Sequence, residues 1–250
     1  MARGISPETN AGANLGSATQ RWQKLFVNEV DAGAQVNGAF NKNVTYTSSG
    51  SFTAPVTGTY RITLVGGGGG GSGAGTVSGV HFAGAGGGQG GVFEFYETLV
   101  AGTSYSYTIG AGGTGGAAGS ATNGTGDSGT AGGNTEITIG ANVYTATGGY
   151  YGRGAAANFY GGPGGSNLIN SIGAPLSTSS FSGDNGVPGT TEARAGAGGG
   201  AGNRADSYSG AFGAGGSGGI LFTQNGTTTY AAGRDGANGY ITFEYYDANA

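Results

Sequence analysis

The chain has 250 residues, no cysteine and a formal net charge of −4. This length fits one large β domain or two modest ones, and the lack of cysteine excludes a disulfide framework and thiolate chemistry. Only 9% of the residues are charged, and no cluster of Lys and Arg predicts binding to nucleic acid. No apolar run approaches the ~18 residues that cross a bilayer, and residues 1–20 lack the apolar stretch of a signal peptide. We therefore expect no membrane insertion, and release from the cell by lysis.

Residues 1–43 are predicted to be an attachment or shaft-like element. Ser17 can cap one or two helical turns, and the i, i+3, i+4 spacing then places Trp22, Leu25 and Phe26 on one face. Such a helix is too short to be stable alone, so we expect it to pack on a neighbour. Together with Arg21, these three side chains are the candidate attachment residues.

Residues 44–250 are predicted to form a glycine-rich β domain. All but seven of the 62 glycines lie within residues 66–239, and the stretches between them are rich in Tyr, Phe, Val, Ile and Thr, which favour strands. Alternation and turn signals such as Asn225-Gly226 predict an all-β, sandwich-like fold. The predicted strands are 44–48, 59–65, 92–96, 104–109, 136–139, 143–146, 220–223, 227–230 and 240–246.

The glycine runs are expected at the ends of these strands. Each glycine costs roughly 0.5–1 kcal/mol of extra backbone entropy in regular structure. Helices of the polyproline-II type have three residues per turn, so runs of glycine can pack side by side and hydrogen-bond to one another. We favour such polyglycine-II segments, and flexible linkers are the alternative. The runs are 66–75, 84–91, 110–119, 148–154, 161–165, 196–202 and 213–219.

The segments that interrupt the glycine runs hold the candidate binding residues, because recognition usually resides on loops that a rigid scaffold positions. These loops are 76–83, 120–131, 155–160, 166–195 and 203–212, of which 166–195 has no strand pattern. Aromatic side chains suit contact surfaces, although the same rings can instead cover glycine backbone or fill the core. The candidate receptor-binding residues are His81, Phe82, Tyr150, Tyr151, Phe159, Tyr160, Phe181, Tyr208 and Phe212.

Catalytic and metal-binding patterns are weak. His81 is the single histidine, and no G-x-S-x-G elbow accompanies it. The carboxylates are scattered and indicate no glycosidase pair. The stretches that begin at Asn123 and Arg234 contain too few carboxylates for Ca²⁺ loops, and we interpret both as turns. We expect no catalytic residue, no metal and no cofactor.

Three blocks of sequence resemble phage tail fibres. The stretch Asn14-Leu-Gly-Ser-Ala-Thr-Gln-Arg-Trp-Gln-Lys-Leu-Phe resembles an element of tail-fibre shafts. The stretches Ser51-Phe-Thr-Ala-Pro and Tyr60-Arg-Ile-Thr-Leu-Val, followed by six glycines, resemble the opening of the glycine-rich domain of tail-fibre tips. The later strands, residues 101–113 and 239–246, are similar to that domain as well. The alternation of glycine runs with variable segments also resembles the distal adhesins of T-even-like phages.

This resemblance implies a homotrimer on the virion, attached through residues 1–43 to an upstream tail-fibre or baseplate protein. It also implies a partner on the bacterial surface, either a glycan or an outer-membrane protein. The main hypothesis is therefore a non-enzymatic receptor-binding tip. A purely structural virion or extracellular matrix protein is the first alternative, and a glycan depolymerase is the second.

Overall fold

The computed structural model describes residues 40–77, 80–119, 124–154, 167–170, 177–181, 212–224 and 227–247. The compact unit to which they belong begins at Phe40, so the predicted shaft-like element and its residues Arg21, Trp22, Leu25 and Phe26 lie outside the described residues. All regular secondary structure in the described residues is β-strand, which confirms the all-β fold. Within these ranges, no segment forms an apolar helix of membrane-spanning length.

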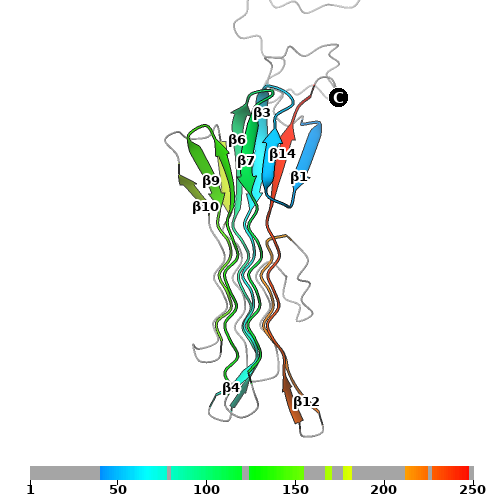
Figure 1. Cartoon of the computed structure of the whole chain (residues 1–250), viewed down its shortest axis with the longest axis vertical. Helices are drawn as coiled ribbons and strands as arrows, with labels where there is room; N and C mark the ends of the chain where they lie inside the picture. The colour runs from blue at the N-terminus through cyan, green and yellow to red at the C-terminus, as the bar shows by residue number, and fades with distance from the viewer. Residues whose placement is uncertain are drawn as a thin grey trace, which may run out of the picture. The chain divides into compact units, whose positions relative to one another are not determined.

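Two antiparallel sheets of five strands each form a sandwich (Figure 1). The strand order is β1-β14-β3-β6-β11 in the first sheet and β10-β9-β8-β7-β2 in the second. The strands of the first sheet are β1 (Lys42–Tyr46), β14 (Tyr240–Tyr245), β3 (Gly58–Val65), β6 (Val92–Leu99) and β11 (Ser177–Phe181). Those of the second are β10 (Asn167–Asn170), β9 (Asn142–Ala146), β8 (Thr135–Ile139), β7 (Ser104–Thr108) and β2 (Gly50–Thr53).

Alternation along each strand separates the core from the outer faces, as the sequence predicts. Tyr60, Ile62 and Leu64 of β3 are buried, whereas Arg61 and Thr63 lie on the other face. Tyr105 and Tyr107 of β7 are buried in the same alternating way. Because successive side chains of a strand point to opposite faces, this pattern gives each sheet one apolar inner face.

Aromatic rings from the two sheets stack on each other in the core. Phe52 of β2 stacks on Phe243 of β14 with ring centroids 4.1 Å apart, and Phe95 of β6 stacks on Tyr144 of β9 at 4.2 Å. Large rings bury much area, and their stacking adds about 0.5–1.5 kcal/mol per pair. These contacts hold the sheets together in a chain that has few aliphatic side chains.

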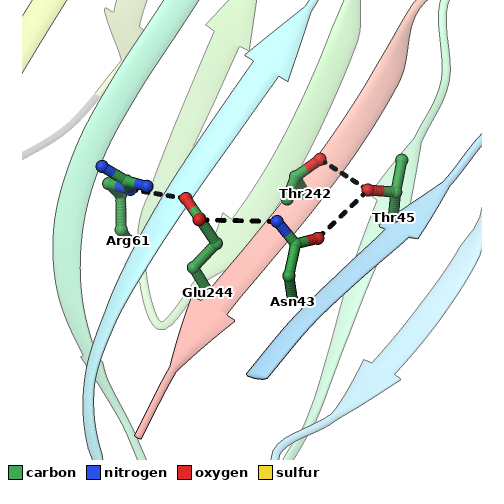
Figure 2. A network of polar contacts seen from close by, with 5 residues as sticks. All are labelled: Asn43, Thr45, Arg61, Thr242 and Glu244. Carbon is green, nitrogen blue, oxygen red and sulfur yellow. Dashed lines mark hydrogen bonds and ion pairs between the residues drawn. The ribbon is translucent and has the colours of Figure 1, made fainter. Parts of the chain in front are cut away.

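The outer face of the first sheet carries a polar network that spans three strands (Figure 2). The Arg61 guanidinium of β3 donates to the Glu244 carboxylate of β14 and forms an ion pair with it. Asn43 of β1 donates to the other oxygen of Glu244 over 3.4 Å, and the hydroxyls of Thr45 and Thr242 are 2.9 Å apart. This network helps to fasten the edge strand β1 to the sheet.

The glycine-rich segments leave the ends of the strands and run side by side (Figure 1). The central segment, residues 66–74, connects β3 to β4 (Gly75–Val77), and every residue of it is buried. Its amides donate in rotation to three neighbouring segments: Gly69 to Gly88, Gly70 to Thr130 and Gly71 to Arg234. The rotation repeats every three residues, which is the period of a polyproline-II helix.

The carbonyls of the central segment bind three further neighbours with the same period. The oxygens of Gly67, Gly68 and Gly69 accept from Gly149, Gly113 and Gly216 in turn. Each outer segment also hydrogen-bonds to the two outer segments beside it, so the described part of the chain forms a ring of six around one. We call this assembly the polyglycine lattice. It consists of residues 66–74, 83–91, 109–119, 124–134, 147–154, 213–220 and 231–239.

Close approach of backbones explains the glycine content of the lattice. A Cβ on Gly68 would lie 1.9 Å from the carbonyl oxygen of Ala214, and one on Gly236 would lie 2.1 Å from that of Gly68. Each transverse hydrogen bond contributes about 0.5–1.5 kcal/mol, which roughly offsets the entropy of ordering a glycine. The prediction of ordered runs is confirmed for those runs that the structure describes, and runs 161–165 and 196–202 lie outside it.

Short polar side chains bind amides at the edge of the lattice. Gly112 and Gly115 donate to the side chains of Asn238 and Asp235 over 2.8 and 2.7 Å. The interpretation of the stretch that begins at Arg234 as a turn is therefore wrong, because residues 231–239 form an extended lattice segment. The similar stretch at Asn123 also enters the lattice from Gly124 onward. The sequence analysis did not recognise either segment, because neither contains a long run of consecutive glycines.

Two of the predicted loops contain strands. Within 166–195, β10 pairs with β9 and β11 pairs with β6, so that one strand extends each sheet. Within 76–83, most of the segment belongs to the hairpin of β4 and β5 (Val80–Phe82). The prediction that these segments lack regular structure is wrong, because pairing with a neighbouring strand can fix a short polar sequence that has little pattern of its own.

Candidate functional site

Two hairpins close the polyglycine lattice at the end away from the sandwich (Figure 1). The first consists of β4 and β5 and connects the central segment to residues 83–91. The second consists of β12 (Leu221–Gln224) and β13 (Thr227–Tyr230) and connects residues 213–220 to 231–239. We call this pair the distal hairpins. The hairpin predicted around Asn225-Gly226 is confirmed by its two strands.

The distal hairpins are bonded to each other through three polar side chains. The hydroxyl of Thr76, on β4, donates to the Tyr230 hydroxyl of β13 over 2.8 Å. The Tyr230 hydroxyl lies 2.6 Å from Nδ1 of His81, on β5, and the two ring centroids are 5.8 Å apart. Thr76 is 2% exposed, so this connection is anchored in a buried group. The two hairpins therefore form one surface.

This surface combines exposed polar and apolar groups. His81 is exposed and Phe82 is half-buried. Val80 is 47% exposed, and Ile220, which immediately precedes β12, is 54% exposed. The predicted candidates His81 and Phe82 thus belong to a strand rather than to a loop, and they lie at an end of the lattice where other molecules can reach them.

No formal charge lies on the distal hairpins. Residues 62–93 and 212–233 contain no Asp, Glu, Lys or Arg, and these stretches include all four strands and the segments that lead into them. Described charged side chains such as Arg61, Asp127 and Arg153 lie on the sandwich or on outer lattice segments instead. The distal hairpins can therefore make hydrogen bonds and apolar contacts, but they supply no ion pairs.

The other described candidates lie apart from the distal hairpins. Tyr150 is 57% exposed and Tyr151 is half-buried, both on the lattice segment 147–154. Phe212 is 49% exposed and packs against Tyr240 with centroids 5.4 Å apart, where segment 213–220 begins near β14. Phe212 therefore lies at the sandwich end of the lattice. Tyr150 and Phe212 are thus exposed, and the Phe212 ring also packs on the sandwich through Tyr240.

Of the remaining candidates, the structure describes the backbone of Phe181 alone. Phe181 is the last residue of β11, where its backbone pairs with Val92. Phe159, Tyr160 and Tyr208 lie outside the described residues. The sequence therefore identified only two residues, His81 and Phe82, of the distal hairpins.

The distal hairpins are joined by hydrogen bonds between uncharged hydroxyls and one imidazole. His81 bonds the hydroxyls of Thr76 and Tyr230, and the described residues contain no group of acidic or histidine side chains spaced to hold a metal ion. Sequence reasoning missed Thr76, Tyr230, Val80 and Ile220. Thr76 and Tyr230 are 154 positions apart, and only the lattice brings them together, so no local pattern reports their contact.

The chain matches a known protein family. The family model described as "Glycine-rich domain" matches residues 45–246. That range begins within β1 and ends just after β14, so it covers the sandwich, the polyglycine lattice and the distal hairpins. A comparison with curated proteins finds no significant relative.

Proposed function

We propose that this chain, which belongs to the glycine-rich domain family, is the receptor-binding tip of a bacteriophage tail fibre. The observation that carries the proposal is the position of the distal hairpins. A lattice whose central segment hydrogen-bonds to all six neighbours holds them away from the sandwich. The glycine residues of the lattice have no side chains that could recognise a receptor. We therefore assign recognition to the side chains of the distal hairpins.

Attachment and recognition then occupy different parts of the chain. Residues 1–43 join an upstream tail-fibre or baseplate protein, and the glycine-rich domain contacts a bacterial surface glycan or an outer-membrane protein. We propose a homotrimer on the virion, because three copies make weak contacts at single sites sufficient for adsorption. Light scattering of the full chain is expected to give three times the 24.0 kDa of one chain. A mass of one chain in dilute solution excludes the trimer.

Adsorption to cells tests receptor binding directly. Fluorescently labelled full chain is incubated with a panel of bacterial strains, and the bound fraction is measured by flow cytometry. We expect saturable binding to some strains, and loss of binding when Val80 and Ile220 are both changed to Asp. The matched control is Gly58→Ala, in β3, where an added Cβ meets nothing within 4 Å. If no strain binds the chain at micromolar concentration, the protein is structural and the proposal fails.

We also propose that the chain performs no chemistry on its receptor. The polar side chains that join the distal hairpins are two hydroxyls and an imidazole, and among the described residues no carboxylate is bonded to this imidazole. A glycosidase requires a facing pair of carboxyl groups. Incubation with purified capsule and lipopolysaccharide is expected to release no reducing ends. If reducing ends are released only when the chain is present, the protein is a depolymerase and this proposal is wrong.

A further inference from the structure

The hydrogen bonds of the three side chains that join the distal hairpins favour one position for the proton of His81. A threonine hydroxyl has one proton, and that of Thr76 is donated to the oxygen of Tyr230. The Tyr230 hydroxyl is then free to donate its own proton to Nδ1 of His81, 2.6 Å away. In neutral imidazole, one nitrogen accepts and the other carries the proton. When Tyr230 donates in this way, Nδ1 is the acceptor and the imidazole proton lies on Nε2. In the opposite tautomer, Nδ1–H would donate to Tyr230, and the measurement below distinguishes the two.

The exposed imidazole of His81 then presents its Nε2–H as a hydrogen-bond donor beside apolar side chains. His81 is exposed, and Val80 and Ile220 are exposed on the same pair of hairpins. The polar side chains of the described hairpin strands are Thr, His, Gln and Tyr. All of them are uncharged when the histidine is neutral. A ligand that fits this surface offers hydrogen-bond acceptors and C–H groups but needs no counter-charge.

The absence of charged residues from the distal hairpins helps to decide between a glycan and an outer-membrane protein as the partner. Charged residues make up about a quarter of an average soluble protein, and interfaces usually meet the charges of a partner with complementary ones. The stretches 62–93 and 212–233 supply none. An uncharged sugar has hydroxyls that accept and donate, and its ring has faces of C–H groups that pack on aliphatic and aromatic side chains. The surface therefore favours a neutral saccharide over an outer-membrane protein.

We infer that the distal hairpins bind an uncharged saccharide, with Nε2–H of His81 donating to a sugar oxygen and Tyr230 positioning the imidazole. This inference rests on the proposed function and names the class of receptor. Tyr230 and Thr76 act through His81, so they are positioning residues. Val80 and Ile220 supply the apolar contact.

The single histidine makes the proton position directly measurable. In full chain labelled with ¹⁵N-histidine, every imidazole signal belongs to His81. At a pH where the imidazole is neutral, we expect the shifts of the Nε2–H tautomer. Tyr230→Phe, which keeps the ring and removes the hydroxyl, is expected to move the signals toward a mixture of tautomers. Tyr150→Phe, an exposed ring on the lattice, is the matched control and is expected to change nothing.

Ligand class is tested with the same variants on an array of bacterial oligosaccharides, half of them neutral and half carrying uronic acid, sialic acid or phosphate. We expect binding to neutral members that is insensitive to salt, because no ion pairs contribute. Binding should fall about tenfold in Tyr230→Phe and at least as much in His81→Phe, as for loss of one hydrogen bond of about 1.4 kcal/mol. Circular dichroism checks that each variant is folded.

Several results overturn the inference. They are the Nδ1–H tautomer in the unmodified chain, binding confined to charged oligosaccharides, no binding to any oligosaccharide, or unchanged binding in His81→Phe. If the chain still adsorbs to cells while any of these is observed, the proposed receptor-binding function stands and only its neutral-saccharide site is wrong. If adsorption to cells is also absent, the proposed function itself fails.

Discussion

At the scale of single residues, the position of a glycine determines what its substitution costs. A Cβ on Gly68 would overlap the Ala214 carbonyl oxygen at 1.9 Å, whereas a Cβ on Gly58 meets nothing within 4 Å. Both residues are glycines in or beside the same strand, yet only the first lies between packed backbones. The amino-acid type alone does not distinguish them, because the difference arises from segments distant in sequence.

Gly68→Ala is expected to destabilise the protein by about 1–3 kcal/mol, the usual cost of overpacking, with further loss from hydrogen bonds of the central segment. Gly58→Ala is expected to be neutral or to stabilise by up to about 1 kcal/mol, because alanine has less freedom in the unfolded chain. Urea unfolding of both variants measures the difference. Equal midpoints for the two variants would show that the lattice is not closely packed in solution.

Buried tyrosines predict a fall in stability at high pH. Burial raises the pKa of Tyr60 to about 12, and burial together with the hydrogen bond to Glu97 does the same for Tyr144. The unfolded chain has tyrosines with a pKa near 10. A group whose pKa is raised on folding contributes stability that is present below the unfolded pKa and is lost as the pH rises through the folded one.

The free energy of unfolding is therefore expected to decrease between about pH 10 and pH 12, where the unfolded state loses protons that the folded state keeps. Tyr60→Phe should reduce this slope, because phenylalanine has no proton to lose. Tyr150→Phe is the control, since Tyr150 is exposed. Urea midpoints measured across this range provide the test, and a slope that is identical in Tyr60→Phe and the parent chain contradicts the assignment.

At the scale of elements, much of the sandwich followed from the sequence. Alternation correctly placed β3, β7 and β14 and their inner faces, because a period of two is a direct consequence of strand geometry. The edge strands β10 and β11 were missed, since Asn167–Asn170 and Ser177–Phe181 have little apolar alternation. These two segments form strands because they pair with β9 and β6 respectively. The lattice was anticipated from its glycine runs, but segments 124–134 and 231–239 were not.

The lattice also predicts a pattern of amide exchange. The amides of residues 66–74 are buried and most donate to neighbouring backbones, so their exchange requires opening of the whole lattice. The amides of Gly112 and Gly115 donate to the exposed side chains of Asn238 and Asp235. We expect exchange of the central segment to be the slowest of the lattice in NMR measurements. Equal exchange rates for the two groups would contradict a central position for residues 66–74.

At the scale of the whole domain, sheet and lattice form one scaffold. Each strand that enters the lattice continues as a segment whose hydrogen bonds run to its neighbours, so the register set in the sandwich is carried to the distal hairpins. This explains how Thr76 and Tyr230 can meet over 2.8 Å although 154 positions separate them. Sequence reasoning identified His81 and Phe82 from their types, but their partners depend on this long-range register.

Footprinting of the bound chain tests most directly whether recognition lies at the distal hairpins. Full chain is bound to cells of an adsorbing strain and exposed to hydroxyl radicals, and oxidation of each side chain is compared with that of the free chain. We predict protection of His81, Phe82 and Tyr230, with Tyr150 and Phe212 unchanged. Protection confined to the outer face of the sandwich or to Tyr150, with the distal hairpins as reactive as in the free chain, would contradict the account.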